Sequence, residues 1–548
     1  MKLKRKALAL ALCLLMLVSL FGCGTQNTPA GSGSASSGEA TSSMLNVHLQ
    51  TEVSTMDAQL ATDGYSFEVI GAVMEGLYRL DTDGSTVYAM AESVEKSEDG
   101  LTYTCKIRDD AKWSNGEPVT AADFVYAWQR AVDPNTASEY AFLYSTANIA
   151  NATACRNGEK PVSELGIQAA DEKTVVVTLD APCAFLESLM AFATFYPLNQ
   201  AFYESCGASY ASSPETLLCN GPFKLSSYEP AATTIVAEKN ENYYDADAVT
   251  ISGVTWKVIK DAQQAMLAYE NQEVDMAILR GEQVELYSDS AEYHPIMSGY
   301  LWFVSPNQHV AGLENENIRL AMAKAVDKEA LVNNVLKDGS VKADYLIPKD
   351  FATGPDGKDY RDGSAEYLSY DVSAAQDYWQ KGLTELGVSG ITLKLDCTDD
   401  ESAQNIALFL QDQWQTNLPG LTVELNPMPK TQAAQNKRAG EYEMTLTRWG
   451  PDYADPMSYL EMWVSGNSNN YGDWSNDEYD QKIAFCFETA DVSARWETMK
   501  EAEAIAADAA VIYPLFQSGS AVMIRSNVSG IEFHSVGVTH VYRNVTIG

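Results

Sequence analysis

The stretch over residues 391–449 constrains the fold of this chain most. Two apolar runs, 391–395 and 421–425, are typical of strands. Between them, residues 402–417 carry apolar side chains at helical spacing, and Leu418-Pro419-Gly420 ends the helix. Strand, helix and strand in this order predict a parallel βαβ unit, because parallel neighbours need a long crossover connection. A third strand, over about 442–447, extends the same α/β sheet.

A polar and aromatic segment follows this third strand. It reads RWGPDYADP over residues 448–456 and carries two carboxylates, Asp452 and Asp455. A surface turn would use both only to cap nearby backbone N–H groups. In open α/β sheets, however, ligands bind beyond the carboxyl ends of the strands, which is the position of Asp452. The pattern therefore favours a ligand contact at Asp452. Asp455 is expected to cap a helix that begins near Met457, and Tyr453 is expected to be structural.

The first 43 residues indicate export. Four cations precede an uncharged apolar run over 7–21, which is short for a membrane span and suits the core of a signal peptide over residues 1–22. Leu20-Phe21-Gly22-Cys23 resembles a bacterial lipobox, which implies that Cys23 is lipidated and anchors the protein to the extracytoplasmic face of the cell membrane. Cleavage without a lipid is the alternative. Residues 23–43 are almost all small or polar, so we expect a flexible tether.

Length and charge limit the remaining function classes. After the tether about 505 residues remain, which predicts two or three lobes and not a single core. The net charge is −38, and it becomes about −42 without the four cations of the signal peptide. Such an acidic chain repels phosphate backbones, which argues against nucleic-acid binding. The same charge also keeps an exported protein soluble.

Motifs of enzymes, cofactor sites and metal sites are missing from the sequence. The five histidines are scattered, and there is no HExxH, GxSxG, Walker or GxGxxG motif. The run from Asp81 to Gly84, with Glu92 at its twelfth place, mimics a calcium loop, but its glycine is misplaced, so we interpret it as a hairpin turn. We therefore predict no cofactor, no metal and no enzymatic activity. An exported hydrolase that uses a carboxylate pair is an alternative without specific support.

The cysteines do not suggest a disulfide scaffold. Seven lie outside the first 23 residues, at irregular spacings and without a CxxC pair. We expect most of them to be buried free thiols, and a local bridge between Cys206 and Cys219 is the alternative.

Several helices and one further strand are marked by their ends. An Asn-Gly turn leads to Thr120, a predicted N-cap with Asp123 three residues on, and the helix is expected to run to about Val132. Residues 174–179 are expected to form a strand. Long amphipathic helices are predicted over 318–336 and over 371–386, the second closed by Gly387.

Six stretches together resemble the oligopeptide- and dipeptide-binding family of extracytoplasmic proteins of ABC importers, in the order of that family. They are MAESVEKSEDGLTYTCKIRDDAKW from Met90, WSNGEPVTAADFVYAWQRAVDPNTAS from Trp113, NGPFKLSSYEP from Asn220, KNENYYDADAV from Lys239, ENENIRLAMAKAVDKEALV from Glu314 and RWGPDYADP from Arg448. The resemblance implies a bilobed α/β clamshell of the periplasmic-binding-protein type II, with an extra subdomain. Lobe I would comprise 45–88, 214–300 and 524–548, the inserted subdomain II 89–213, and lobe III 301–523.

The resemblance also implies the function. Family members bind a peptide as an added strand in a closing cleft and deliver it to a permease driven by ATPases. We expect a monomer that captures oligopeptides. A nickel chelate, haem, an oligosaccharide or a signalling peptide is the alternative cargo, because one fold hosts several ligands.

Site residues follow from the matching positions. Asp452 would hold the α-ammonium group of the peptide, and Trp449 and Gly450 would lie alongside its backbone, although Trp449 could also be core packing. Asp63, Gly64 and Tyr65 would form the facing strip. The sequence departs from the family pattern at Pro429 and Asn436, where a tryptophan and an arginine are usual, and at Ile278 and Leu279, which replace polar pocket residues. Lys437 and Arg438 could meet a peptide carboxylate instead of Asn436, or they could be plain solvated charges.

Overall fold

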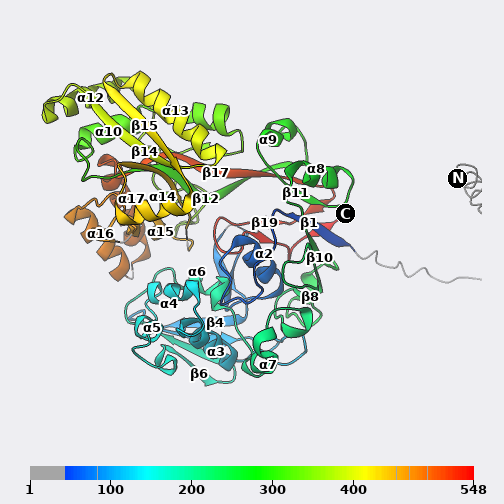
Figure 1. The fold of residues 1–548 in the computed structure, drawn as a ribbon. Coiled ribbons are helices and arrows are strands. Elements are labelled where there is room, and N and C mark those ends of the chain that lie inside the picture. The colour runs from blue at the N-terminus through cyan, green and yellow to red at the C-terminus, as the bar shows by residue number, and fades with distance from the viewer. Residues whose placement is uncertain (1–42, 83, 452, 468, 490) are drawn as a thin grey trace, which may run out of the picture. The chain divides into compact units, whose positions relative to one another are not determined.

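The computed structural model of this chain describes residues 43–82, 84–451, 453–467, 469–489 and 491–548 (Figure 1). The predicted signal peptide, most of the tether, Cys23 and Asp452 lie outside the described residues. Within the described ranges, none of the helices combines the length and the apolar character that a membrane crossing needs.

One sheet of eleven strands organises the fold. Its two longest strands, β12 and β17, pair antiparallel at its centre. In order across the sheet, the strands are β15 (Leu421–Met428), β14 (Ile391–Thr398), β16 (Met444–Trp449), β12 (Tyr293–Pro306), β17 (Tyr513–Ile524), β11 (Met276–Leu279), β1 (Met44–Leu49), β10 (Gly253–Val258), β9 (Thr234–Lys239) and β8 (Phe223–Ser227), and β13 (Val341–Lys342) pairs with β17.

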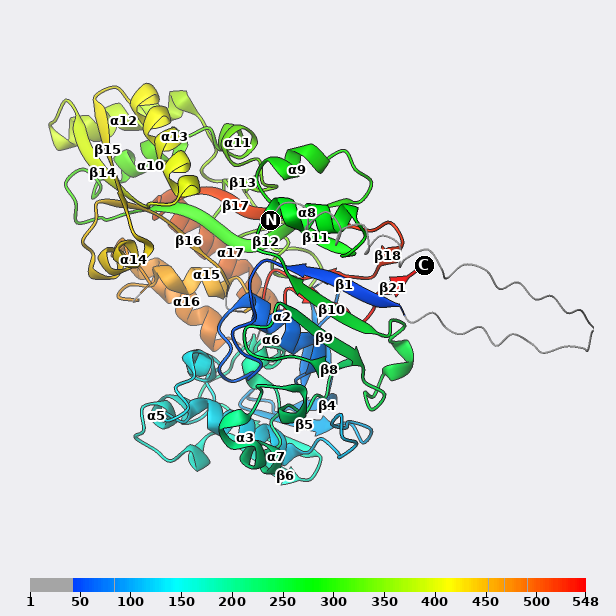
Figure 2. The same ribbon diagram turned by 45° about the vertical axis from the view of Figure 1, so that its right-hand side comes forward.

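The central strands join two halves of this sheet, which we name the β14 half (β14, β15 and β16) and the β1 half (β1 and β8 to β11). One end of β12 pairs with β16, from Leu301 opposite Trp449 onward, whereas one end of β17 pairs with β11, with Ala521 opposite Leu279. The register between β12 and β17 shifts between these two regions. Figures 1 and 2 show both strands running from the neighbourhood of β14 to that of β11. The two halves are therefore connected through β12 and β17.

The predicted βαβ unit is confirmed. Strands β14 and β15 pair in parallel, and α13 (Glu401–Asn417) connects them. The side chain of Asp400 caps this helix by accepting a hydrogen bond from the Ala403 N–H group. Strand β16 is parallel to β14, so the carboxyl ends of all three strands lie at one edge of the sheet.

The predicted helix over 318–336 is wrong as a single element. Helix α10 (Glu316–Lys324) ends early, and a new turn, α11 (Lys328–Ala330), continues into a π-helix, η7 (Leu331–Leu336). The cause is Asp327, whose carboxylate accepts a hydrogen bond from the Ala330 N–H group at 2.9 Å. Aspartate is favoured at helix starts and not in helix interiors, so it begins a new element here.

A smaller antiparallel sheet lies in the segment that we predicted as an inserted subdomain. Its strands, in order, are β4 (Ala91–Lys96), β5 (Thr102–Ile107), β7 (Thr174–Thr178) and β6 (Ile167–Asp171). Helix α3 (Ala121–Val132) packs on it with Phe124 and Trp128 fully buried. As predicted, Thr120 and Asp123 form a capping box: the Asp123 carboxylate accepts a hydrogen bond from the Thr120 N–H group at 2.8 Å. The strand expected over 174–179 is β7.

The remaining predictions of local structure are confirmed. Helix α12 (Val372–Leu386) is capped by Asp371 and closed by Gly387 in the left-handed conformation, φ +69°. The run from Asp81 lies in a hairpin between β2 (Tyr78–Leu80) and β3 (Thr86–Tyr88). All seven described cysteines are free thiols, and six of them are buried. Other helices are α2 (Gly64–Val73), α6 (Leu186–Met190), α8 (Ala262–Glu270), α9 (Glu282–Tyr287), α14 (Lys430–Ala439), α15 (Met457–Leu460), α16 (Asp477–Glu488) and α17 (Val492–Asp508).

Candidate ligand-binding cleft

A cavity of about 740 Å³ lies between the two halves of the sheet. On the side of the β1 half it is lined by Gly64 and Tyr65, at the start of α2, and by residues 278–281. On the side of the β14 half it is lined by the first turns of α13. Two of the site residues predicted from the sequence, Gly64 and Tyr65, therefore line the cavity. Ile278 and Leu279, which stand at predicted pocket positions, line it as well and add apolar surface to it.

Asp63 holds the start of the helix that carries Gly64 and Tyr65. It is the N-cap of α2, and its carboxylate accepts hydrogen bonds from the Ser66 N–H group at 2.9 Å and from the Ser66 hydroxyl at 2.7 Å. The Ser54 hydroxyl donates to the same carboxylate. These bonds fix the start of α2, and with it the placement of Gly64 and Tyr65. Asp63 itself is not among the residues that line the cavity.

Tyr65 belongs to a network with Gln50 and Arg280. The Tyr65 hydroxyl donates a hydrogen bond to Gln50 Oε1 at 2.9 Å, and the Arg280 guanidinium donates to the same oxygen. Gln50 directly follows β1 and Arg280 directly follows β11, so the network stands at the carboxyl ends of two parallel strands. Burial raises the pKa of Tyr65, opposed by the nearby Arg280 charge, so its hydroxyl stays a neutral donor.

Sequence reasoning missed Arg280. The available signal was its position directly after a short apolar strand and before Gly281. Gly281 has φ +52° and ψ −131°, a conformation that side chains other than glycine rarely adopt. Such a turn at a strand end commonly marks a place where the chain presents groups to a ligand.

Trp449 and Gly450 lie at the carboxyl end of β16. The Trp449 ring is partly buried against the core, and its indole N–H group donates to the Ser458 carbonyl at 2.8 Å, which agrees with the packing alternative. Gly450 is packed against Tyr300: an added Cβ atom would lie 2.2 Å from the ring atom Cε1, so only a hydrogen fits without moving this ring. Neither residue lines the 740 Å³ cavity. Trp449 instead borders a small pocket of about 10 Å³.

Lys437 and Arg438, both on α14, differ in their surroundings. The Lys437 ammonium donates to the Thr447 hydroxyl at 2.9 Å and lies 4.4 Å from the centre of the Tyr471 ring. Burial, reinforced by the charge of Arg438, lowers the pKa of Lys437 to about 8. Lys437 is therefore not a plain solvated charge, whereas Arg438 is exposed. Neither lines the 740 Å³ cavity.

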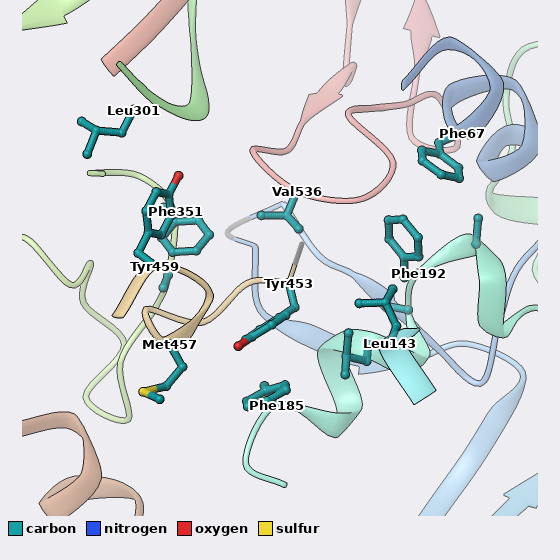
Figure 3. Close-up of a cluster of buried hydrophobic side chains, with 14 of the residues drawn as sticks. Phe67, Leu143, Phe185, Phe192, Leu301, Phe351, Tyr453, Met457, Tyr459 and Val536 are labelled. Atoms are coloured by element: carbon teal, nitrogen blue, oxygen red, sulfur yellow. The ribbon is translucent and has the colours of Figure 1, made fainter. Parts of the chain in front are cut away.

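The segment after Asp452 is structural, as predicted for Tyr453. The Tyr453 ring is buried and lies against Phe185 (Figure 3), and its hydroxyl donates to Glu461 at 3.0 Å. The Asp455 carboxylate accepts a hydrogen bond at 2.9 Å from the N–H group of Met457, the first residue of α15, whereas Pro456 and not Asp455 occupies the N-cap position. Asp455 also forms a two-point ion pair with buried Arg495, at 2.7 and 2.9 Å, which the sequence did not indicate.

Residues 85–471 match the family model described as bacterial extracellular solute-binding proteins, family 5 Middle. This match covers well over half of the chain. The chain belongs to solute-binding protein family 5. It therefore has the bilobed periplasmic-binding-protein fold and is an extracytoplasmic binding protein and not an enzyme, as predicted.

Relatives of this family 5 protein align over nearly their full length. The dipeptide-binding protein of Lactococcus lactis subsp. cremoris (strain MG1363) is 33% identical over 523 residues, which are 92% of this chain and 94% of the relative. Listeria monocytogenes OppA, solved bound to peptide, is 36% identical with a TM-score of 0.72, and the match covers 93% of this chain and 99% of that one.

A third relative was solved in an open form without ligand. The unliganded open form of the murein tripeptide-binding protein MppA is only 26% identical, yet its TM-score is 0.81, with 93% of this chain and 98% of that chain covered. The score exceeds that of peptide-bound OppA despite the lower identity. The described chain is therefore more similar in backbone to the open form than to the peptide-bound one.

Proposed function

We propose that this family 5 protein captures oligopeptides in its cleft and delivers them to an ABC permease for ATP-driven import. The observation that carries the proposal is the 740 Å³ cavity between the two halves of the sheet. It combines apolar walls with polar groups at strand ends, which is the usual composition of a ligand site. Relatives with full-length matches include a dipeptide-binding protein and an OppA solved with peptide.

The peptide would bind as an added strand. Backbone hydrogen bonds then provide affinity for many sequences, and hydrated side-chain pockets tolerate variation. We assign the α-ammonium group of the peptide to Asp452 and its backbone to the strips at Trp449-Gly450 and Gly64-Tyr65. Closing the cleft would exclude water from Asp452. Loss of one partner of such a buried charged pair costs about 3 to 5 kcal/mol, roughly a hundredfold to several thousandfold in affinity.

The domain arrangement and the anchor belong to the same proposal. Lobe I (45–88, 214–300 and 524–548) and lobe III (301–523) would close on the ligand, with subdomain II (89–213) attached to lobe I. This division would place the lobe boundaries within β12 and β17, the strands that connect the two halves of the sheet. The protein would act as a monomer, held at the extracytoplasmic face of the membrane by a lipid on Cys23.

Mass spectrometry of ligand that copurifies with the protein tests the cargo. Peptides are expected. A nickel chelate, haem or an oligosaccharide would contradict the proposal, and one unique peptide species would favour a signalling role. Calorimetry then tests the assigned site: Asp452→Asn is expected to weaken binding of a recovered peptide at least about a hundredfold. The matched control is Asp412→Asn, an exposed carboxylate on α13, which is expected to bind like the wild type. Equal affinities of both variants would refute the role of Asp452.

A further inference from the structure

Arg280 is the one Lys or Arg among the described residues that line the 740 Å³ cavity. Three carboxylates, Glu68, Asp338 and Glu401, line the same cavity. Within the described part of the chain, no carboxylate oxygen lies within 4.0 Å of the Arg280 guanidinium, and the residue is exposed and lines both this cavity and an adjoining open pocket beside α8 and α9. The cavity thus presents a cation that the described chain does not neutralise.

None of the three carboxylates that line the cavity pairs with Arg280. Glu68 is buried and accepts hydrogen bonds from the Trp256 indole at 3.1 Å, from His540 Nδ1 at 2.7 Å and from the Tyr542 hydroxyl. Asp338 follows η7 and Glu401 opens α13, and neither carboxylate is paired with the Arg280 guanidinium. Arg280 therefore lines the cavity without an ion-pair partner among the three carboxylates described there.

The guanidinium is held in a defined place. The guanidinium donates a hydrogen bond to Gln50 Oε1, the oxygen that also accepts a hydrogen bond from the Tyr65 hydroxyl. A guanidinium has five N–H donors in a planar fork that matches both oxygens of a carboxylate, so further donors are available to a ligand. Ile278 and Leu336 contribute apolar surface to the cavity. Apolar surroundings strengthen a charge pair formed there.

We propose that Arg280 binds a carboxylate of the captured peptide, either its C-terminus or an acidic side chain. This inference rests on the proposed capture of peptides and names the group that meets the anionic part of the ligand. Lys437 and Arg438 were the candidates from the sequence, but neither lines the cavity, whereas Arg280 does.

Calorimetry with matched peptides tests Arg280. The probes are alanine peptides of three to six residues, as free acids and as C-terminal amides, and the same amides with one Glu or one Gln. The wild type is expected to bind the acid about tenfold or more tighter than the amide, and Arg280→Gln to bring this ratio close to one. If an acidic side chain supplies the carboxylate, the wild type is expected to bind the Glu-containing amide more tightly than the Gln-containing amide. Arg280→Gln is then expected to bind the two amides equally. Arg280→Lys is expected to retain part of either preference.

Several results would overturn the proposal. One such result is that Arg280→Gln still binds the free acid more tightly than the amide. Another is that Lys437→Gln or Arg438→Gln, and not Arg280→Gln, loses this preference. Equal weakening of acids and amides in Arg280→Gln, reproduced by Glu401→Gln, would assign Arg280 to an ion pair across the closed cleft. Near-ultraviolet circular dichroism verifies that each variant is folded. Failure of the wild type to bind every alanine peptide would instead count against the proposed peptide cargo, so the two failures are distinguishable.

Discussion

The Tyr453 ring stacks on the Phe185 ring, with centroids 4.1 Å apart and planes 13° from parallel (Figure 3). Tyr453 follows β16, and Phe185 immediately precedes α6 in the segment over 89–213. A backbone contact supports the stack, since the Ala454 N–H group donates to the Ser188 hydroxyl at 3.2 Å. The end of the predicted ligand segment is thus fixed by residues far away in the sequence.

Removal of the Phe185 ring is expected to destabilise the protein. Phe185 is 4% exposed, and deletion of a buried phenyl ring costs about 3 to 5 kcal/mol through lost burial and the remaining cavity. Urea denaturation of Phe185→Ala measures this loss in the free energy of unfolding. The control is Phe485→Ala, because Phe485 is 42% exposed and a surface change is expected to stay within about 0.5 kcal/mol. Similar losses in both variants would show that the stack contributes little.

The Asp455–Arg495 pair yields a second prediction. Both residues are buried, at 8% and 3% exposure, so loss of one charge leaves the other without compensation. Asp455→Asn is expected to lower the free energy of unfolding by about 3 to 5 kcal/mol. Replacement of both residues, Asp455→Leu with Arg495→Met, is expected to recover part of this loss.

The matched control for this pair is an exposed one. Lys482 and Glu501 form an ion pair at 2.7 Å, but Glu501 is 62% exposed, so Glu501→Gln is expected to change stability by less than about 1 kcal/mol. Chemical denaturation of the four proteins in the same buffer gives the comparison. A loss in Asp455→Asn no larger than in Glu501→Gln would contradict the assignment of a buried pair.

Local patterns were sufficient for much of the fold. The βαβ unit over 391–449 was predictable because hydrophobic period, helix length and stop signals all lie within about sixty residues. The cap at Thr120 and the helix end at Gly387 were predictable for the same reason. The break at Asp327 was missed because the apolar stripe continues across it, and only the capping preference of aspartate indicates a new start.

The candidate site was less predictable, because its contacts are distant in the sequence. Arg280 and Gln50 are 230 positions apart, and Asp455 and Arg495 are 40 apart. No periodicity links such partners. Asp63 illustrates the reverse case: the sequence marked a strip of which Gly64 and Tyr65 line the cavity, but the Asp63 carboxylate caps α2. Side-chain direction, and not position along the chain, separates such a cap from a ligand contact.

Lys437 yields a prediction about pH. Its pKa in the folded protein, about 8, is below the ordinary value of 10.5, so between these values the unfolded chain holds a proton that the folded chain has released. The contribution of Lys437 to the free energy of unfolding therefore rises with pH between about 8 and 10.5. The free energy of unfolding of the wild type minus that of Lys437→Met is expected to increase from pH 7 to pH 10, on the order of 1 kcal/mol after allowance for solvent screening.

Urea denaturation at several pH values measures this difference. The control is Lys430→Met on the same helix, because Lys430 is exposed and its replacement is expected to leave the shape of the pH curve unchanged. A constant difference between the wild type and Lys437→Met from pH 7 to pH 10 would show that the ammonium keeps an ordinary pKa.

Tryptophan fluorescence is expected to report ligand binding through two residues. Of the ten tryptophans, Trp302 and Trp449 are only partly buried, and they come from paired strands, with Leu301 opposite Trp449. The other eight are at most 8% exposed, so a ligand changes their surroundings little. Peptide binding is expected to shift the emission of the wild type, and the double variant Trp302→Phe/Trp449→Phe is expected to lose most of this shift while Trp474→Phe retains it. If the double variant binds peptide with the full emission change, the ligand does not lie along β16, and the strip at Trp449 and Gly450 would lose its proposed role.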